Sequence, residues 1–151
     1  MKILKLGAGG VGGYFGARLH EVGGEVTFLV RPKRAELLSQ QGLIVETPSQ
    51  TIRIQPQLVT KDKLQHRYDL VMLSPKAYDL EDALETVKEV PGNPFYLPLL
   101  NGFDHLKRMD DEFGRERLMG GVAHIAAELT DKGIVRPLNA LHRFTVGIRH
   151  A

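Results

Sequence analysis

The chain has 151 residues, of which 42% are hydrophobic and 25% charged, and its formal net charge at pH 7 is +2. This length suits one domain with a full hydrophobic core and is too short for two domains of ordinary size. The small net charge argues against a broad basic face for nucleic acid, and the absence of cysteine excludes disulfides, thiolate metal sites and cysteine nucleophiles.

No apolar run approaches the roughly 18 residues of a membrane span. Glycines also interrupt the first apolar stretch before a secretory signal could form. We therefore expect a cytoplasmic protein that binds neither membranes nor nucleic acid.

Residues 2–16 predict a strand, a glycine turn and a helix, the order that a dinucleotide site requires. The apolar strand leads directly into three glycines with the spacing GxGxxG: Gly7, Gly9 and Gly12. Apolar residues then recur every three or four positions, as on one face of a helix: Val11, Phe15, Leu19 and Val22.

Each glycine of such a motif has its own task. Gly7 permits the tight exit from the strand, Gly9 lets the backbone approach a pyrophosphate, and Gly12 lets the helix lie against the strand. The first N–H groups of the helix have no partners within it and point at the anion. The predicted pyrophosphate loop consists of Gly7, Ala8, Gly9, Gly10, Val11 and Gly12. The alternative is a glycine-rich turn without a ligand.

Residues 25–30 are rich in β-branched and aromatic residues and predict a second parallel strand, which ends at Arg31. An NAD-binding domain places an acidic residue at this point, about twenty residues past the glycines, to hold the ribose 2′-hydroxyl. A guanidinium instead accepts a 2′-phosphate through charge-assisted hydrogen bonds. Arg31 therefore predicts NADP as the cofactor; the alternative is that Arg31, Lys33 and Arg34 are a solvated helix start.

The middle of the chain continues this α/β pattern. Pro32 and Gly42 suit the start and the end of a helix over residues 32–41. Residues 43–47 and 51–54 predict a hairpin, and residues 69–74 predict a buried strand. A helix that carries Leu80, Leu84 and Val87 follows, with Asp79 as its expected cap.

The last part of the chain begins with an apolar strand at residues 95–100. Because Pro98 cannot donate to a ladder, this strand is expected to lie near a sheet edge or to be broken. A helix around residues 106–113 follows, and strands are expected at 118–129, 134–138 and 144–148. We therefore predict an α/β fold of the Rossmann type. Its doubly wound, mainly parallel sheet would have an antiparallel extension at the C-terminal end.

Ligands of open α/β sheets lie beyond the carboxyl ends of the strands. Lys76 and Asn101 each follow a predicted strand at that edge. Lys76 could hold a cofactor ribose or an acidic substrate, and Asn101 could orient a hydroxyl or an amide. The alternatives are an exposed loop lysine and a simple Asn-Gly turn residue.

Two other kinds of chemistry have no support. The six histidines include no HExxH and no i,i+4 pair, so we expect no metal site. No serine lies in a GxSxG motif, so serine hydrolase chemistry is not expected either.

Several segments together resemble the N-terminal domain of the ketopantoate reductase (2-dehydropantoate 2-reductase) family. In chain order they are KILKLGAGGVGGYFGARL, FLVRPKR, SPKAYDLEDALE, LPLLNG, GGVAHIAAEL and PLNALHRFTVG. The resemblance covers essentially the whole chain, and this order of motifs is far more specific than the glycines alone. Pro75 departs from the family pattern, in which this position more often carries a small or β-branched residue.

The resemblance implies an NADPH-dependent reduction of a 2-oxo acid, ketopantoate, on the route to pantothenate and coenzyme A. It implies that Gly7 to Gly12 bind the pyrophosphate and Arg31 the 2′-phosphate, and that Lys76 and Asn101 line the nicotinamide and substrate cleft. The backbone near Ala126 would be a further cofactor contact.

In the family, the proton donor is a lysine with a glutamate and a serine nearby, all on a helical C-terminal domain. The resemblance therefore implies that residues 1–151 are the dinucleotide-binding domain, with no catalytic residue of their own. We expect this chain to bind NADP(H) weakly and not to turn over ketopantoate alone. An apolar flank left exposed would support self-association into a homo-oligomer. The alternatives are a non-catalytic nucleotide-binding module and a reductase of another 2-oxo acid.

Overall fold

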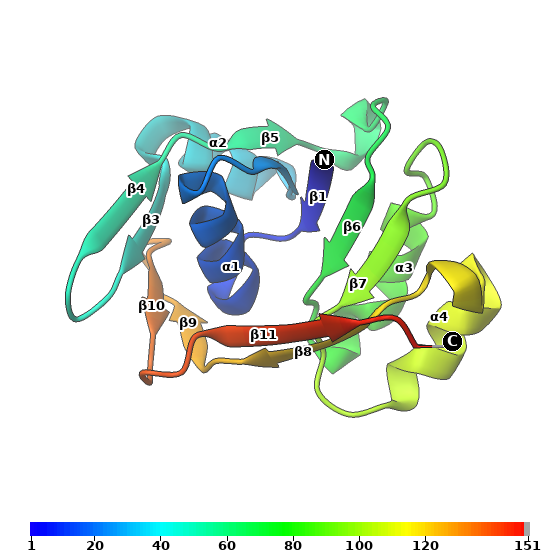
Figure 1. The fold of residues 1–151 in the computed structure, drawn as a ribbon. Helices are drawn as coiled ribbons and strands as arrows, with labels where there is room; N and C mark the ends of the chain where they lie inside the picture. The colour runs from blue at the N-terminus through cyan, green and yellow to red at the C-terminus, as the bar shows by residue number, and fades with distance from the viewer. Residues whose placement is uncertain (150–151) are drawn as a thin grey trace.

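The structure, a computed structural model, describes residues 1–149. At its centre lies a parallel sheet of five strands, β1 (Lys2–Leu6), β2 (Glu25–Leu29), β5 (Gln57–Val59), β6 (Leu70–Leu73) and β7 (Phe95–Pro98). Their order is β5-β2-β1-β6-β7, so β1 is in the middle (Figure 1). The chain winds from β1 toward β5 in its first half and from β6 to β7 in its second, which confirms the predicted doubly wound α/β class.

Helices cover both faces of this sheet. The α-helices of the described chain are α1 (Gly10–Glu21), α2 (Pro32–Gln41), α3 (Leu80–Val87) and α4 (Asp104–Phe113), and its short 3₁₀ turns are η1 (Lys61–Lys63), η2 (Ala77–Asp79) and η3 (Arg115–Arg117). One hydrophobic cluster joins Ile3 of β1 to α1 and α2, and a second joins Leu4 to α3 and α4. Since neighbouring strand residues point to opposite faces, the two helix pairs lie on opposite sides of the sheet. No helix in residues 1–149 has the length and apolar character to cross a membrane.

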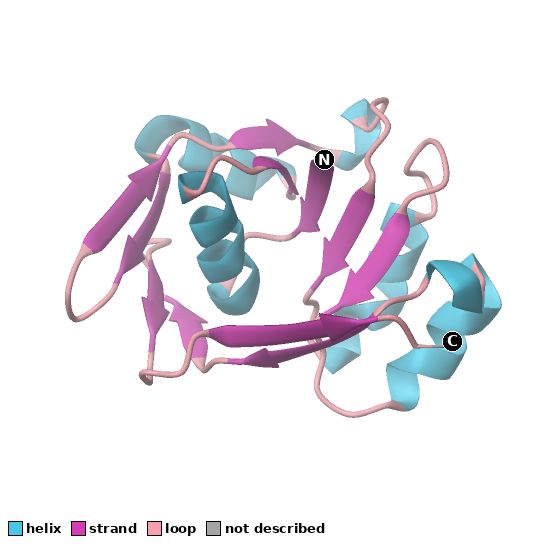
Figure 2. Cartoon of the chain, viewed as in Figure 1, coloured by secondary structure: helices cyan, strands magenta, loops and turns pink. Residues whose placement is uncertain are grey.

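A second sheet packs against α1. β3 (Leu43–Glu46) and β4 (Thr51–Ile54) form the predicted antiparallel hairpin. β10 (Val135–Pro137) extends it by pairing in parallel with β3 and antiparallel with β9 (Ala127–Leu129). Helix α1 therefore lies between the five-stranded sheet and this four-stranded one (Figure 2). All residues from Gly12 to Ala17 are buried, so α1 is enclosed rather than amphipathic.

The remaining strands, β8 (Gly120–His124) and β11 (Arg143–Gly147), form an antiparallel two-stranded sheet. The C-terminal strands are thus antiparallel, as predicted. They are divided between two small sheets, however, and do not join the main sheet as a continuous ladder. A single parallel bridge, between Tyr96 and Leu118, links the β8 side to β7.

Pro98 explains why this pairing stops. The N–H groups of Phe95 and Leu99 donate to the β6 side of β7, whereas the O of Tyr96 accepts from Met119 N at 2.9 Å on the other side. Pro98 would present the next donor on that free side, and proline has no N–H. The predicted edge position of this strand is therefore confirmed.

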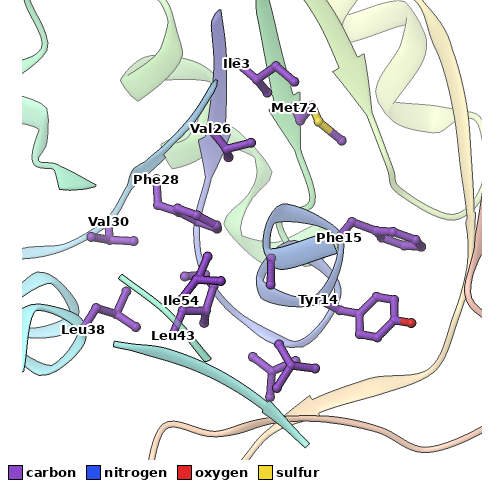
Figure 3. Close-up of a cluster of buried hydrophobic side chains, with 14 of the residues drawn as sticks. Ile3, Tyr14, Phe15, Val26, Phe28, Val30, Leu38, Leu43, Ile54 and Met72 are labelled. Carbon is purple, nitrogen blue, oxygen red and sulfur yellow. The ribbon is translucent and has the colours of Figure 1, made fainter. Parts of the chain in front are cut away.

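The core around α1 gives a direct test of the fold. Figure 3 shows Phe28 with Phe15, Leu38 and Ile54 in the cluster that surrounds the helix. Phe28 is 0% exposed, and a Cβ placed on Gly16 would lie 2.5 Å from its ring. The ring thus fills the space that the glycine leaves.

We expect Phe28→Ala to lower the free energy of unfolding by about 3–5 kcal/mol, because the truncation leaves a cavity between α1 and β2. Chemical denaturation would measure the loss. Val22→Ala is the matched control, because Val22 is 82% exposed; its effect should stay within about 0.5 kcal/mol. Similar losses in both variants would contradict the packing described.

Candidate dinucleotide site

The glycine turn joins β1 to α1 by a close approach of backbone to backbone. Gly7 has a φ of +79°, a conformation that residues with side chains rarely adopt. Its N–H donates to Leu29 O at 2.9 Å, which ties the turn to the end of β2. A Cβ on Gly12 would lie 3.0 Å from Gly7 O. The helix can therefore approach the strand end only without a side chain at Gly12, as predicted.

Outside this turn the space is open. A Cβ placed on Gly7 or Gly9 would meet no heavy atom within 4 Å. Gly9 is the N-cap of α1, and no side chain caps the helix. The N–H groups of the first turn therefore keep their hydrogen-bonding capacity, with the positive end of the helix dipole behind them. These donors and the free space above them fit a phosphate group.

Arg34, in the first turn of α2, reaches across to the glycine turn. Its Nη2 donates to Ala8 O at 2.9 Å, and both Nη1 and Nη2 lie 3.3 Å from Gly133 O. Partial burial lowers the pKa of this guanidinium below its ordinary value. Its Nε is buried without a hydrogen-bond partner in the described chain. Arg34 is therefore not part of a solvated helix start; it holds the turn and places a positive charge beside it.

Arg31 behaves differently, although it lies on the same helix. It is the N-cap residue of α2, and its side chain is 79% exposed. Its Nη2 lies 3.4 Å from Oδ2 of Asp82, in the first turn of α3. An exposed pair of this kind contributes at most about 1 kcal/mol, so Arg31 can exchange partners easily. Since β1 lies between β2 and β6, the pair spans the carboxyl edge of the sheet beside the glycine turn.

The other predicted polar residues reach the same edge from β6 and β7. These strands are parallel, with Leu73 opposite Pro98, and Lys76 and Asn101 follow them. Both side chains are exposed. Lys76 Nζ lies 5.8 Å from the centre of the Tyr78 ring, within cation–π range. Gly102 has a φ of +77°, so the Asn-Gly segment forms a turn, and this geometry does not depend on a functional role of Asn101.

Ala126 lies close to the start of α1. Its O accepts from Leu138 N at 2.7 Å, and its N–H donates to Asn139 Oδ1 at 3.4 Å. The next residue, Ala127, packs so tightly on the helix start that a Cβ on Gly10 would overlap its carbonyl. The predicted cofactor contact at Ala126 is thus near the first helical N–H groups.

Two hollows of the structure lie away from this edge. In the described part of the chain, a hollow of about 560 Å³ lies between α2 and β5, and one of about 440 Å³ between α1 and the β3–β4 turn. Neither includes the glycine turn, Lys76 or Asn101. Within residues 1–149, no three His, Asp or Glu side chains group together as a metal site would require.

Residues 3–150 match the family model for ketopantoate reductase PanE/ApbA. The chain belongs to this family. Among its relatives, the uncharacterized oxidoreductase YkpB of Bacillus subtilis is 40% identical over 148 residues, which are 97% of this chain and 48% of YkpB. The chain thus spans about half the length of this relative. The predicted family membership is confirmed.

Solved structures of similar proteins share the fold. The 2-dehydropantoate 2-reductase of Geobacter metallireducens superposes with a TM-score of 0.86 at 27% identity, covering 98% of this chain and 49% of that one. A ternary structure of D-mandelate dehydrogenase with NADH and anilino(oxo)acetate gives a TM-score of 0.84 at 26% identity, covering 97% of this chain and 47% of that one. The family is one of oxidoreductases, and the names of these similar proteins refer to different substrates.

Two residues at this edge, Lys5 and Ser74, are not predicted as site residues by the sequence pattern, and Arg34 is predicted only as part of a helix start. Lys5 lies inside the apolar run of β1 and is 0% exposed. Burial lowers the pKa of its ammonium to about 7. Its Nζ lies 2.7 Å from Ser74 Oγ, just past β6. A lysine flanked by apolar strand residues is the signal that could have revealed this pair.

The depressed pKa of Lys5 predicts a specific dependence of stability on pH. Between the folded value of about 7 and the ordinary value of 10.5, the unfolded chain binds a proton that the folded chain does not. Stability from this group therefore rises with pH across that window, by about 1.4 kcal/mol per pH unit at most, and is lowest below pH 7. Relative to Lys5→Met, we expect the wild type to gain roughly 2 kcal/mol between pH 7 and pH 9.

Urea unfolding at several pH values would measure this difference. Lys2→Met removes the same charge from an exposed position on the same strand and should follow the wild type. Parallel pH profiles for the wild type and Lys5→Met would show that Lys5 titrates normally.

Proposed function

We propose that this chain forms the dinucleotide-binding half of an NADPH-dependent reductase of a 2-oxo acid, with 2-dehydropantoate as the favoured substrate. One observation carries the proposal: the uncapped start of α1 opens onto free space beside the exposed guanidinium of Arg31. The first feature suits a pyrophosphate, and the second suits a 2′-phosphate. A cytoplasmic location fits this chemistry.

Each part of the site would hold a different part of the ligands. The N–H groups that open α1 would bind the pyrophosphate, and Arg31 would leave Asp82 for the 2′-phosphate. Arg34 would keep the turn in place through Ala8 O. When bound, a reduced nicotinamide supplies the hydride that attacks the carbonyl carbon of the substrate.

Lys76 and Asn101 would act at the nicotinamide end. The Lys76 ammonium would attract the carboxylate of a 2-oxo acid, and the Asn101 amide would donate to its carbonyl oxygen, orienting it for attack. Two apolar side chains near them, Tyr78 and Phe103, are 78% and 82% exposed. These side chains suit contact with further protein, either the helical domain or a second copy.

Arg31 should decide the choice of cofactor. If its contact with the 2′-phosphate contributes about 1.5–3 kcal/mol, NADPH should bind roughly tenfold to a hundredfold more tightly than NADH. Arg31→Asp should remove this preference, because a carboxylate repels the phosphate and can accept from the ribose hydroxyls. Fluorescence titration with both dinucleotides would measure it.

Lys33→Asp is the matched control, because it makes the same change of charge at an exposed position two residues away. It should keep most of the NADPH preference. If both variants lose the preference equally, the effect is general electrostatics and Arg31 has no specific role.

A second experiment separates binding from turnover. Carbonyl reduction needs a proton donor for the developing alkoxide, which we expect on the helical domain implied by the resemblance. The 151-residue chain should therefore bind NADPH but show no steady-state oxidation of NADPH with 2-dehydropantoate, followed by absorbance. Turnover well above that of an Asn101→Ala variant would contradict this proposal and place the proton donor within the chain.

A further inference from the structure

Lys5 occupies a position where a central parallel strand normally carries an apolar residue. It lies on β1, between β2 and β6, and its whole side chain is buried. Its Nζ donates to Leu6 O at 2.9 Å, to Ser74 Oγ at 2.7 Å and to Met72 O at 3.4 Å. All three acceptors are neutral. None of the ion pairs within residues 1–149 includes Lys5.

The ammonium lies directly beneath the first turn of α1. A Cβ placed on Gly12 would be 2.9 Å from Lys5 Nζ and 2.9 Å from Ser74 Oγ. Gly12 therefore has a second consequence besides close packing: it leaves the space in which these two side chains meet. Since the helices change faces between β1 and β6, this is the switch point of the sheet, where open α/β folds bind their ligands.

Other ionisable groups on the elements around Lys5 do not neutralise it. Arg34 reaches the same turn from α2, and it is also a cation. No described residue of β6 from Leu70 to Leu73 is ionisable. The remaining ionisable residues of β1, β2 and α1 are Lys2, Glu25, Tyr14, Arg18, His20 and Glu21.

Most of these groups are remote from the ammonium along their elements. Lys2 and Glu25 lie opposite each other in the strand register, at the other end of the strands, and Glu21 is the last residue of α1. The ring of Tyr14 packs on Phe15 and lies 6.5 Å from that of His142. Arg18 pairs with Glu21 at 3.0 Å. Lys5 therefore has hydrogen-bond acceptors but no counter-charge, and an anion above the glycine turn would provide one.

We propose that Lys5, through Ser74, is a positioning residue of the dinucleotide site, and that its protonation is linked to binding of the dinucleotide phosphates. This inference rests on the proposed function, because it takes the glycine turn as the phosphate site. Protonated Lys5 adds positive charge below the helix start and draws Ser74 toward β1. Neutral Lys5 removes that charge. Phosphate binding and proton uptake therefore favour each other.

Because Lys5 is buried, the direction in which NADPH affinity changes with pH can be predicted. The ammonium titrates near pH 7 in the free protein, and a bound anion raises its pKa. Affinity for NADPH should then fall by about fivefold between pH 7 and pH 9, if binding raises the pKa by about one unit. This window avoids the 2′-phosphate itself, whose second ionisation lies near pH 6, about one unit below.

The experiment is fluorescence titration of NADPH at pH 7, 8 and 9 with the wild type, Lys5→Met and Lys2→Met. The wild type and Lys2→Met should lose affinity together as pH rises, whereas Lys5→Met should change by less than about twofold. Calorimetry at pH 8 in buffers of different ionisation enthalpy should show proton uptake on binding for the wild type and none for Lys5→Met. An equal loss of affinity in Lys5→Met and wild type would overturn the role of Lys5 while leaving dinucleotide binding intact.

A second measurement covers the case in which the Lys5→Met variant does not fold, and a further result would refute the proposed function itself. If Lys5→Met does not fold, an NMR titration of the Lys5 side chain in the wild type, with and without NADPH, tests the same linkage. A pKa raised by NADPH supports it, and an unchanged pKa refutes it. If the wild type binds no NADPH at any of these pH values, the proposed function fails and this inference fails with it.

Discussion

The close approach of α1 to the structure around it is the constraint on which the rest depends. Glycines on successive faces of the helix start make it possible: a Cβ on Gly12 would crowd Lys5 and Ser74, one on Gly13 would meet Val135, and one on Gly16 would meet Phe28. The helix is therefore held from the main sheet and from the four-stranded sheet at once. Because contacts on several sides determine its position, the N–H groups at its start point in a fixed direction toward the carboxyl edge.

Two partly or fully buried basic side chains, Lys5 and Arg34, lie at the start of this helix. Lys5 and Arg34 both lose solvation, and burial lowers the pKa of each. Neither pairs with a carboxylate within residues 1–149. One lies beneath the glycine turn and the other holds it from the side through Ala8 O. A fold that served only stability would place apolar groups at such positions. Their convergence with the helix dipole produces a positive region at a glycine turn that side chains leave open.

Local patterns predicted the main elements well, because strand and helix periods and the Pro32 start are properties of short segments. Long-range pairing could not be read in the same way: β10 joins β3 across about ninety residues, and only the three-dimensional packing on α1 selects that partner. In the candidate site, too, local features could be predicted and long-range contacts could not. The sequence located the glycine turn and the strand ends, but two arginines three residues apart look alike in a pattern. Only the structure reveals that Arg34 is packed on the turn while Arg31 is exposed.

The exposed ion pair of Arg31 and Asp82 lies where the proposed 2′-phosphate would bind. Asp82 is stabilised where it lies, because a carboxylate in the first turn of a helix is favoured by the dipole of α3. It keeps the guanidinium near the edge of the sheet without holding it firmly, since both side chains are more than two-thirds exposed. A 2′-phosphate carries more charge than one carboxylate and offers three oxygens, so in the proposed site it would compete well for Arg31. The freed Asp82 would then repel that phosphate, so the proposed preference for a phosphorylated dinucleotide would be the difference between these two effects.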